Sequence, residues 1–258
     1  MNMPEQKRTS GSVTYGAAFA DVYDEWYGTS DALEAIVELL SESHPRRVLE
    51  LGVGTGRIAL ALARRLAAME QPTTGAVHVA GIDESPEMLA RLHAKDAQRR
   101  ISSHLGDMAR EQPPGPFDLV FASYNTLFNL TSSPLQAECL ANAATRLTAT
   151  GRVVIDACVI DPQAPTTGAT SERRGPWKLQ TNSTYEPASG NIRGVTVSTH
   201  DDGRIVRRPF HITYQSPEAI DASCHRAGLR LVSRYSSWQK APFDDSSSRH
   251  VSVYDNVR

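Results

Sequence analysis

The segment from Val48 to Ala61, VLELGVGTGRIALA, constrains the fold of this chain more than any other part of its sequence. An apolar run comes first, and an amphipathic run ends near Leu66. Between them lie three glycines at alternate positions: Gly52, Gly54 and Gly56. This order predicts a buried strand, a tight turn and a helix. Because glycine lets backbone approach a ligand closely and a helix start presents unpaired N–H groups, we expect a ligand here.

Glu50 is an acid inside this otherwise apolar strand. Burying a carboxyl group costs on the order of several kcal/mol unless it is hydrogen-bonded. We therefore expect Glu50 to brace the glycine loop from beneath.

The glycine spacing distinguishes this loop from two other nucleotide-binding patterns. Dinucleotide sites carry G-x-G-x-x-G, and triphosphate-binding loops end in Lys-Ser or Lys-Thr. This chain instead has E-x-G-x-G-x-G and no such lysine. The pattern resembles motif I of the class I S-adenosylmethionine-dependent methyltransferases. That resemblance implies a Rossmann-like fold with the methionine half of the cofactor at this loop, whereas the alternative is a glycine turn in an ordinary α/β domain.

Composition argues against several other classes of protein. A net charge of −2 over 258 residues gives no reason to expect a nucleic-acid or membrane partner. The three cysteines are far apart, without the spacing of a zinc or redox site. The first ten residues are polar and show no export signal, and no apolar stretch is long enough to span a membrane. We expect a cytoplasmic protein without a metal.

A second apolar strand, Ala76–Ile82, ends at Asp83 and precedes a helix that begins at Pro86, with Ser85 as its cap. An acid at this strand end can accept both ribose hydroxyls of a nucleoside. Asp83 is therefore the expected ribose ligand, and the alternative is a cap for the following helix. The polar stretch at 69–75 is expected to be a surface insertion.

Two further strand ends complete the expected cofactor site. Asp107 and Met108 follow a short third strand, and the resemblance implies that they meet the adenine edge; a simple turn acid is the alternative. Phe117–Ala122 is an apolar fourth strand that closes with Ser123, Tyr124 and Asn125. Ser123 is expected beside the cofactor, while Tyr124 and Asn125 are candidates to orient the methyl acceptor.

The N-terminal segment YGAAFADVYDEWY is rich in aromatic residues at helical spacing. Core packing would explain this stripe without any function. The alternative is a lid over the cofactor sulfonium in which Tyr15, Tyr23 and Tyr27 contact the cofactor, since aromatic faces attract cations. This opening resembles small-molecule methyltransferases of bacterial secondary metabolism, and among them the amino-sugar N,N-dimethyltransferases of macrolide pathways.

The last third of the chain alternates like β structure from Trp177 to Tyr214, which predicts three antiparallel strands. A helix at Pro217–Ala227 and two strands then complete the core. The expected fold is α/β: a Rossmann-like, doubly wound, seven-stranded sheet with an antiparallel last strand, plus an inserted antiparallel β cap. We expect a cofactor-binding core at 1–160, the insertion at 161–215 and closing elements at 216–258. The resemblance implies that the insertion covers the acceptor site and serves in homodimer contacts.

These features together predict transfer of a methyl group from S-adenosylmethionine to an amine or hydroxyl of a small metabolite. Positioning accounts for most of the catalysis of such a reaction. A hydroxyl acceptor usually needs a base, for which His211 and His250 are candidates, although each also suits a structural role. The alternatives are a protein or nucleic-acid methyltransferase and a protein of this fold that binds the cofactor without transferring methyl.

Overall fold

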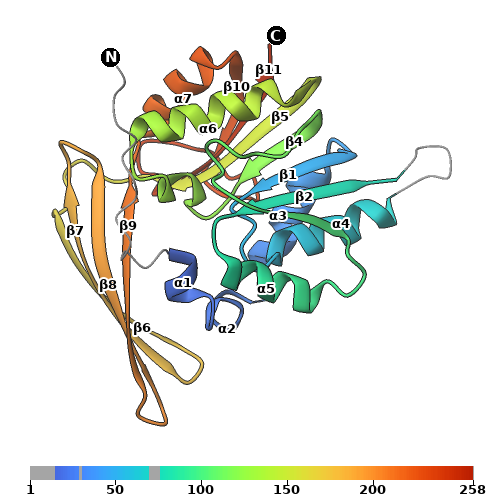
Figure 1. Cartoon of the computed structure of the whole chain (residues 1–258). Coiled ribbons are helices and arrows are strands. Elements are labelled where there is room, and N and C mark those ends of the chain that lie inside the picture. The colour runs from blue at the N-terminus through green and yellow to red at the C-terminus, as the bar shows by residue number, and fades with distance from the viewer. Residues whose placement is uncertain (1–14, 29–30, 70–75, 258) are drawn as a thin grey trace, which may run out of the picture.

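The computed structural model describes residues 15–28, 31–69 and 76–257, whose strands form two sheets (Figure 1). The larger, the core sheet, has helices on both faces, and the smaller, the inserted sheet, stands to one side of it. The polar first ten residues and nearly all of the predicted insertion at 69–75 lie outside the described residues.

The core sheet has the predicted doubly wound topology. Its seven strands are, in spatial order, β10 (Leu229–Tyr235), β11 (Arg249–Asn256), β5 (Leu147–Cys158), β4 (Phe117–Ala122), β1 (Arg47–Leu51), β2 (His78–Asp83) and β3 (Ile101–Leu105). β1 to β5 pair in parallel, whereas β11 runs antiparallel to both β5 and β10. Chain order reverses between β1 and β4, which is where open α/β sheets bind ligands.

Helices cover the two faces of this sheet and bury separate hydrophobic clusters. α3 (Asp31–Ser41), α4 (Arg57–Ala68) and α5 (Pro86–Lys95) pack on one face, and α6 (Ser133–Thr145) and α7 (Pro217–Arg226) on the other. The sequence interpretation did not include α3. Its apolar residues Leu33, Ile36, Val37 and Leu40 have the i, i+3, i+4, i+7 spacing that indicates such a helix.

The inserted sheet has four antiparallel strands where three were predicted: β6 (Thr167–Arg174), β7 (Trp177–Glu186), β8 (Asn191–His200) and β9 (Ile205–Thr213). The strand that was missed is β6, at the edge of the sheet. Its sequence, TGATSERR, is polar and almost wholly exposed, so it lacks the apolar alternation that marked the other three.

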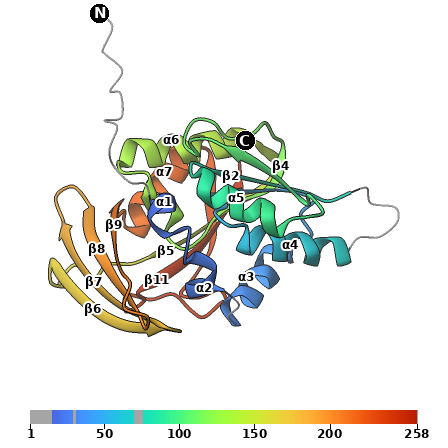
Figure 2. The same cartoon turned by 60° about the horizontal axis from the view of Figure 1, so that its bottom comes forward.

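The aromatic N-terminal segment forms two short helices, α1 (Tyr15–Phe19) and α2 (Tyr23–Tyr27). We call residues 15–28 the lid segment. It lies between the inserted sheet and the helices of the core (Figure 2). Its aromatic side chains form a third hydrophobic cluster, shared with Trp177 and Leu179 of β7.

The glycine loop connects β1 to α4 in left-handed backbone. Gly56 has φ +75°, and a Cβ built there would lie 1.9 Å from Cδ1 of Leu92, which is fully buried in α5. This glycine therefore lets α4 begin directly against α5.

We expect Gly56→Ala to lower the free energy of unfolding by about 2–4 kcal/mol, because it combines strained backbone with overlap in a packed core. Urea denaturation measures the loss. Gly203→Ala is the matched control: Gly203 has φ +92°, and no described atom beyond its chain neighbours lies within 4 Å of its added Cβ. Equal losses in the two variants would show that the overlap with Leu92 is not the cause.

Candidate functional site

A cavity of about 1110 Å³ opens at the carboxyl ends of the parallel strands. The glycine loop, the ends of β2 and β3, the turn after β4, the lid segment and the inserted sheet all contribute to it. Ten of the predicted site residues line it: Tyr15, Tyr23, Tyr27, Gly52, Gly54, Asp83, Asp107, Met108, Tyr124 and Asn125.

Asp83 joins the glycine loop to the end of β2. One carboxylate oxygen accepts the Gly54 N–H at 2.8 Å and the other accepts the Ser85 N–H at 2.9 Å. Burial raises the pKa of this carboxyl group, and these two hydrogen bonds act in the opposite direction. The cap of α5 is Ser85 itself, whose side chain accepts the Met88 N–H. Asp83 therefore holds the loop in place at the cavity wall.

Gly54 presents open space to the cavity. It has φ +54°, and a Cβ built there would meet only Met88 Sδ, at 3.9 Å, among the described atoms. Any side chain at this position would occupy the volume next to the loop. The missing Cβ therefore leaves room for a ligand.

Glu50 lies beneath this wall, fully buried, and is not one of the lining residues. Burial raises the pKa of its carboxyl group well above the ordinary value, opposed by the charge of Arg57 and the N–H of Ala59. Its Oε2 is buried and has no hydrogen-bond partner among the described residues. Glu50 thus contacts the first turn of α4 and keeps one buried oxygen without a hydrogen-bond partner among the described residues.

Asp107 and Met108 form the wall beyond β3. The Asp107 N–H donates to Glu111 at 2.7 Å, and its Oδ1 accepts the Ala109 N–H at 2.8 Å. This turn fixes the carboxylate, as the simple turn interpretation predicted, while the residue also faces the cavity.

The turn after β4 has two consecutive non-glycine residues in left-handed backbone, Tyr124 with φ +51° and Asn125 with φ +63°. Such backbone persists only where its surroundings hold it. The buried carboxylate of Asp156 in β5 accepts the Tyr124 N–H at 2.8 Å, and the Asp156 carbonyl accepts the Asn125 N–H at 3.1 Å. Asn125 Oδ1 in turn accepts the Cys158 N–H at 2.6 Å. The strand beside β4 therefore orients both side chains.

The Tyr124 ring is held on two sides by cations. The guanidinium carbons of Arg57 and Arg249 lie 4.7 Å and 4.9 Å from its centroid. Arg249 also makes a two-point ion pair with Asp156. The sequence interpretation gave Asp156 no role, although an acid inside an apolar strand was the available signal.

The lid segment brings its tyrosines over the glycine loop. Burial raises the pKa of Tyr15 and of Tyr23 well above the ordinary value for a phenol. Both phenols are therefore neutral near pH 7 and can donate hydrogen bonds. These tyrosines line the cavity and also pack with one another, since Tyr23 and Tyr27 have ring centroids 5.0 Å apart.

The inserted sheet supplies the opposite wall through Thr196, Phe210 and Ile212, none of which was predicted. A Cβ at Gly194 would lie 2.4 Å from the Phe210 ring, so the glycine makes room for that ring across the sheet. Asn129, after β4, was also missed. The residue is among those that line the cavity, and its Oδ1 is buried without a hydrogen-bond partner among the described residues. Only the packing of the insertion against the core reveals these positions.

Five predicted site residues are not among the lining residues: Glu50, as described above, Gly56, Ser123, His211 and His250. Ser123 is buried at the end of β4. His211 alternates with Phe210 and Ile212 along β9, so its side chain points to the other face of the sheet, where it lies 3.0 Å from Asn191 Oδ1. His250 is fully buried between β5 and β10 and contacts Ser252 Oγ at 2.8 Å. Neither histidine is placed to act as a base in this cavity.

No cluster of potential metal ligands is found in the described part of the chain. None of its described helices is long and apolar enough to cross a membrane.

The sequence and the fold of this chain are similar to those of known proteins. Residues 48–151 match the model of a methyltransferase domain. The chain is similar to the structure of the CcbJ methyltransferase from Streptomyces caelestis, with 31% identity and a TM-score of 0.82 over 95% of this chain and 99% of that one. A search of curated proteins found no match.

Two more distant structures share the fold. The amino pentose methyltransferase CalS10 from Micromonospora echinaspora is 18% identical, with a TM-score of 0.67 over 98% of this chain and 100% of that one. The sugar N-methyltransferase KedS8 from Streptoalloteichus is 16% identical, with the same TM-score over 98% of each chain. At these identities the likeness concerns the fold alone.

The burial of His250 has a consequence for stability. Its pKa falls from 6.5 to about 4, mainly because burial disfavours the charged form. Between these values the unfolded chain binds the proton and the folded chain does not. We therefore expect the free energy of unfolding to decrease by up to about 3 kcal/mol as pH falls through this range.

Urea denaturation at a series of pH values measures this dependence. His250→Gln is expected to remove most of it. His225→Gln, at an exposed position of α7, serves as the control and is expected to leave it unchanged. An unaltered pH profile in the His250 variant would assign the dependence to other groups.

Proposed function

The chain belongs to the S-adenosylmethionine-dependent methyltransferases, and on that premise we propose that it methylates a neutral amine of a small natural-product metabolite. One observation carries the proposal: the cavity has the family's cofactor motif on one wall and the inserted sheet on the other. Among its described lining residues, moreover, none is a histidine.

The residues of the first wall suit the cofactor. Gly54 leaves open volume beside the loop, and Glu50 retains a buried acceptor atom beneath it. We propose that Asp83 accepts the ribose hydroxyls and that Asp107 and the Met108 N–H meet the adenine edge. The methionine half would lie between the glycine loop and the lid segment.

The lid tyrosines suit that half of the cofactor. The hydroxyls of Tyr15 and Tyr23 remain protonated because burial raises the pKa of both, so they can donate to a carboxylate. Aromatic faces also stabilise a nearby cation such as a sulfonium. We propose that the lid segment binds the methionine carboxylate and excludes water from the sulfonium.

The second wall suits the acceptor. Phe210 and Ile212 offer apolar surface, and Asn129 Oδ1 offers a buried acceptor atom without a partner among the described residues. Leaving such an atom unpaired costs about 1–3 kcal/mol, which an N–H of the substrate would offset. We propose that Tyr124 and Asn125 complete this half, and that residues 161–215 form the acceptor cap of the protein.

An amine fits the polar groups better than a hydroxyl does. Both oxygens of Asp83 accept backbone N–H groups, Asp107 Oδ1 accepts the Ala109 N–H, and Glu138 pairs with Arg110. Three of the four acids among the lining residues, the fourth being Glu84, are thus engaged with donors of the protein itself, whereas a hydroxyl acceptor needs a base. The names of CalS10 and KedS8, an amino pentose and a sugar N-methyltransferase, support the same choice.

The chemistry then depends mainly on position. S-adenosylmethionine would supply a methyl carbon activated by its positively charged sulfur, with the neutral thioether of S-adenosylhomocysteine as the leaving group. An acceptor amine would form the new N–C bond as the C–S bond breaks, and the ammonium product would lose its proton to solvent. The chain's contribution is to align the nitrogen, through Asn129 and Tyr124, in a cavity from which the lid excludes water.

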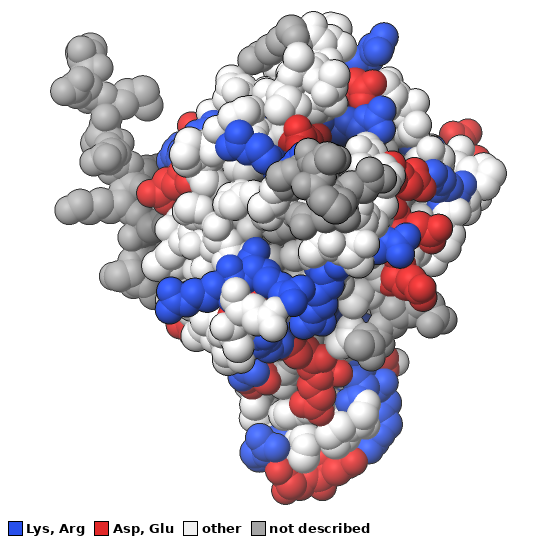
Figure 3. Space-filling view, turned by 90° about the vertical axis from the view of Figure 1, so that its right-hand side faces the viewer, with Lys and Arg blue, Asp and Glu red and all other residues white. Residues whose placement is uncertain are grey.

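Methylation of a nucleic acid is the less favoured alternative. Basic and acidic side chains are intermingled on the face shown in Figure 3, and the net charge is −2. Binding to a phosphate backbone favours a clustered basic surface instead. The other alternative is a protein of this fold that binds the cofactor without transferring methyl. Only an assay of methyl transfer distinguishes this alternative from the proposed enzyme.

We expect Asp83→Ala and Gly54→Ala each to weaken the binding of S-adenosylhomocysteine at least tenfold, about 1.4 kcal/mol, in titration calorimetry. The first removes the proposed ribose ligand, and the second fills the open volume beside the loop. Glu87→Gln, which removes an exposed acid at the start of α5, is the control for charge. Unchanged affinity in both test variants would reject the proposed site.

We expect methyl transfer to amines, measured by mass spectrometry as a gain of one CH₂ per methyl. The acceptors are amino sugars and sugar-nucleotide amines, each paired with the matching hydroxyl compound. The rate should rise with pH until the acceptor amine is neutral. Methylation of the hydroxyl partners alone would contradict the proposed acceptor, and cofactor binding with no methylation of any member would favour the non-methylating alternative.

A further inference from the structure

We propose that the inserted sheet positions the cofactor lid, and that Arg208 of β9 is the positioning residue that links the two. The inference rests on the proposed placement of the methionine half of the cofactor beneath the lid segment. It assigns the insertion a second role, in cofactor binding, beyond covering the acceptor.

Arg208 holds the junction between the two lid helices. It is only 3% exposed, although it is charged. Its guanidinium makes a two-point ion pair with Asp21, at 2.6 Å and 2.8 Å, and also donates to the carbonyl of Ala18. Its Nε donates to Ser198 Oγ of the neighbouring strand at 3.2 Å. A planar guanidinium with these four contacts fixes the direction in which α1 leads into α2.

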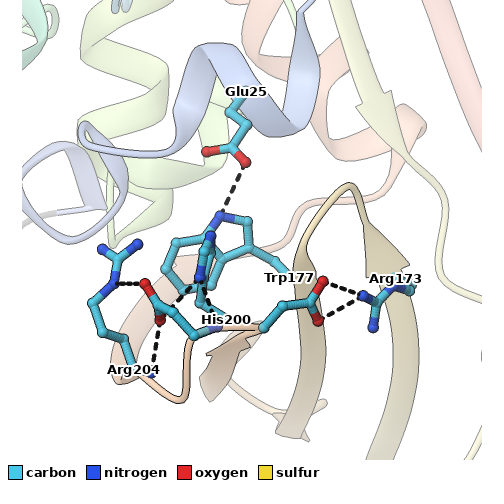
Figure 4. Close-up of polar contacts among 7 residues, drawn as sticks. Glu25, Arg173, Trp177, His200 and Arg204 are labelled. Atoms are coloured by element: carbon cyan, nitrogen blue, oxygen red, sulfur yellow. Dashed lines mark hydrogen bonds and ion pairs between the residues drawn. The ribbon is translucent and has the colours of Figure 1, made fainter.

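Aromatic contacts support the same junction. The Arg208 guanidinium carbon lies 5.3 Å from the Trp26 ring centroid and 5.9 Å from that of Phe19. Trp177, at the start of β7, packs edge to face on Trp26 and donates from Nε1 to Glu25 at 3.1 Å (Figure 4). The side of the lid that faces away from the glycine loop is therefore attached to the inserted sheet.

The opposite side of the lid presents Tyr15, Tyr23 and Tyr27 to the cavity. Each helix of the lid segment has five residues, too few to be stable without tertiary contacts. Loss of the Arg208 contacts would let these tyrosines move, so the cost should appear in the binding of the methionine half and not of the adenosine half.

The same strand also faces the acceptor. Arg208, Phe210 and Ile212 alternate along β9 and share one face of the sheet, and the latter two line the cavity. One strand thus contacts both the lid and the acceptor wall, which couples the two halves of the site through a rigid element.

The test compares two ligands in titration calorimetry: S-adenosylhomocysteine, and 5′-methylthioadenosine, which lacks the amino-acid part. Asp21→Asn is the primary variant, because Asp21 is 56% exposed and its loss should not prevent folding. We expect about tenfold weaker binding of S-adenosylhomocysteine and less than twofold change for 5′-methylthioadenosine. Arg208→Met should change the two affinities in the same way, and the double variant should bind S-adenosylhomocysteine no more weakly than Arg208→Met alone.

Arg173→Met is the matched control. Arg173 has an exposed side chain on the same sheet and pairs with Asp201, so this ion pair includes no residue of the lid segment (Figure 4). It should leave both affinities unchanged. Hydrogen exchange of residues 15–27 in the ligand-free protein gives a second measurement; exchange should become faster in Asp21→Asn and Arg208→Met but not in Arg173→Met.

Three results would overturn the inference: unchanged affinity for S-adenosylhomocysteine in Asp21→Asn and Arg208→Met, equal losses for the two ligands, or additive losses in the double variant. None of them would bear on the acceptor, which the methylation of amines tests separately.

Discussion

The buried carboxylate of Asp156 is the contact on which the geometry of the site depends. It accepts the Tyr124 N–H, the indole N–H of Trp238 and both donors of the Arg249 guanidinium, all from different segments of the chain. A buried carboxylate needs such partners, because desolvation without them is costly. The hydrogen bonds to the Asp156 carboxylate hold the strained turn after β4 at the edge of the cavity, with the Tyr124 ring between two arginines.

The lid segment is the second point at which separate parts of the chain meet. It is joined to the core through Asp24, which accepts from Thr55 and Lys95, and to the inserted sheet through Asp21 and Glu25. Its hydrophobic cluster is distinct from the two that flank the core sheet. The lid therefore depends on both sheets, and the site closes where core, lid and insertion come together.

Most of the core could be predicted from local pattern. β1, α4, β4 and α7 begin or end within a residue or two of their predicted bounds, because apolar periodicity, the glycine turn and the Ser-Pro caps are local signals. β6 could not be predicted in this way, since an exposed edge strand is stabilised by its neighbour's backbone and needs no apolar face. The bend between the two aromatic helices was not predictable from helical spacing either, because it depends on the ion pair between Arg208 and Asp21.

The sequence alone determined the family and one wall of the cavity, because the glycine spacing and the acids at successive strand ends are fixed by connectivity and by the geometry of a parallel sheet. Tertiary structure decided the rest. It placed Phe210, Ile212 and Asn129 opposite that wall and left His211 and His250 out of the cavity. Strand alternation sends neighbouring side chains to opposite faces, and which face meets the core depends on how the insertion docks. That docking is set by contacts between residues nearly two hundred positions apart, such as Arg208 with Asp21, and no local pattern contains it.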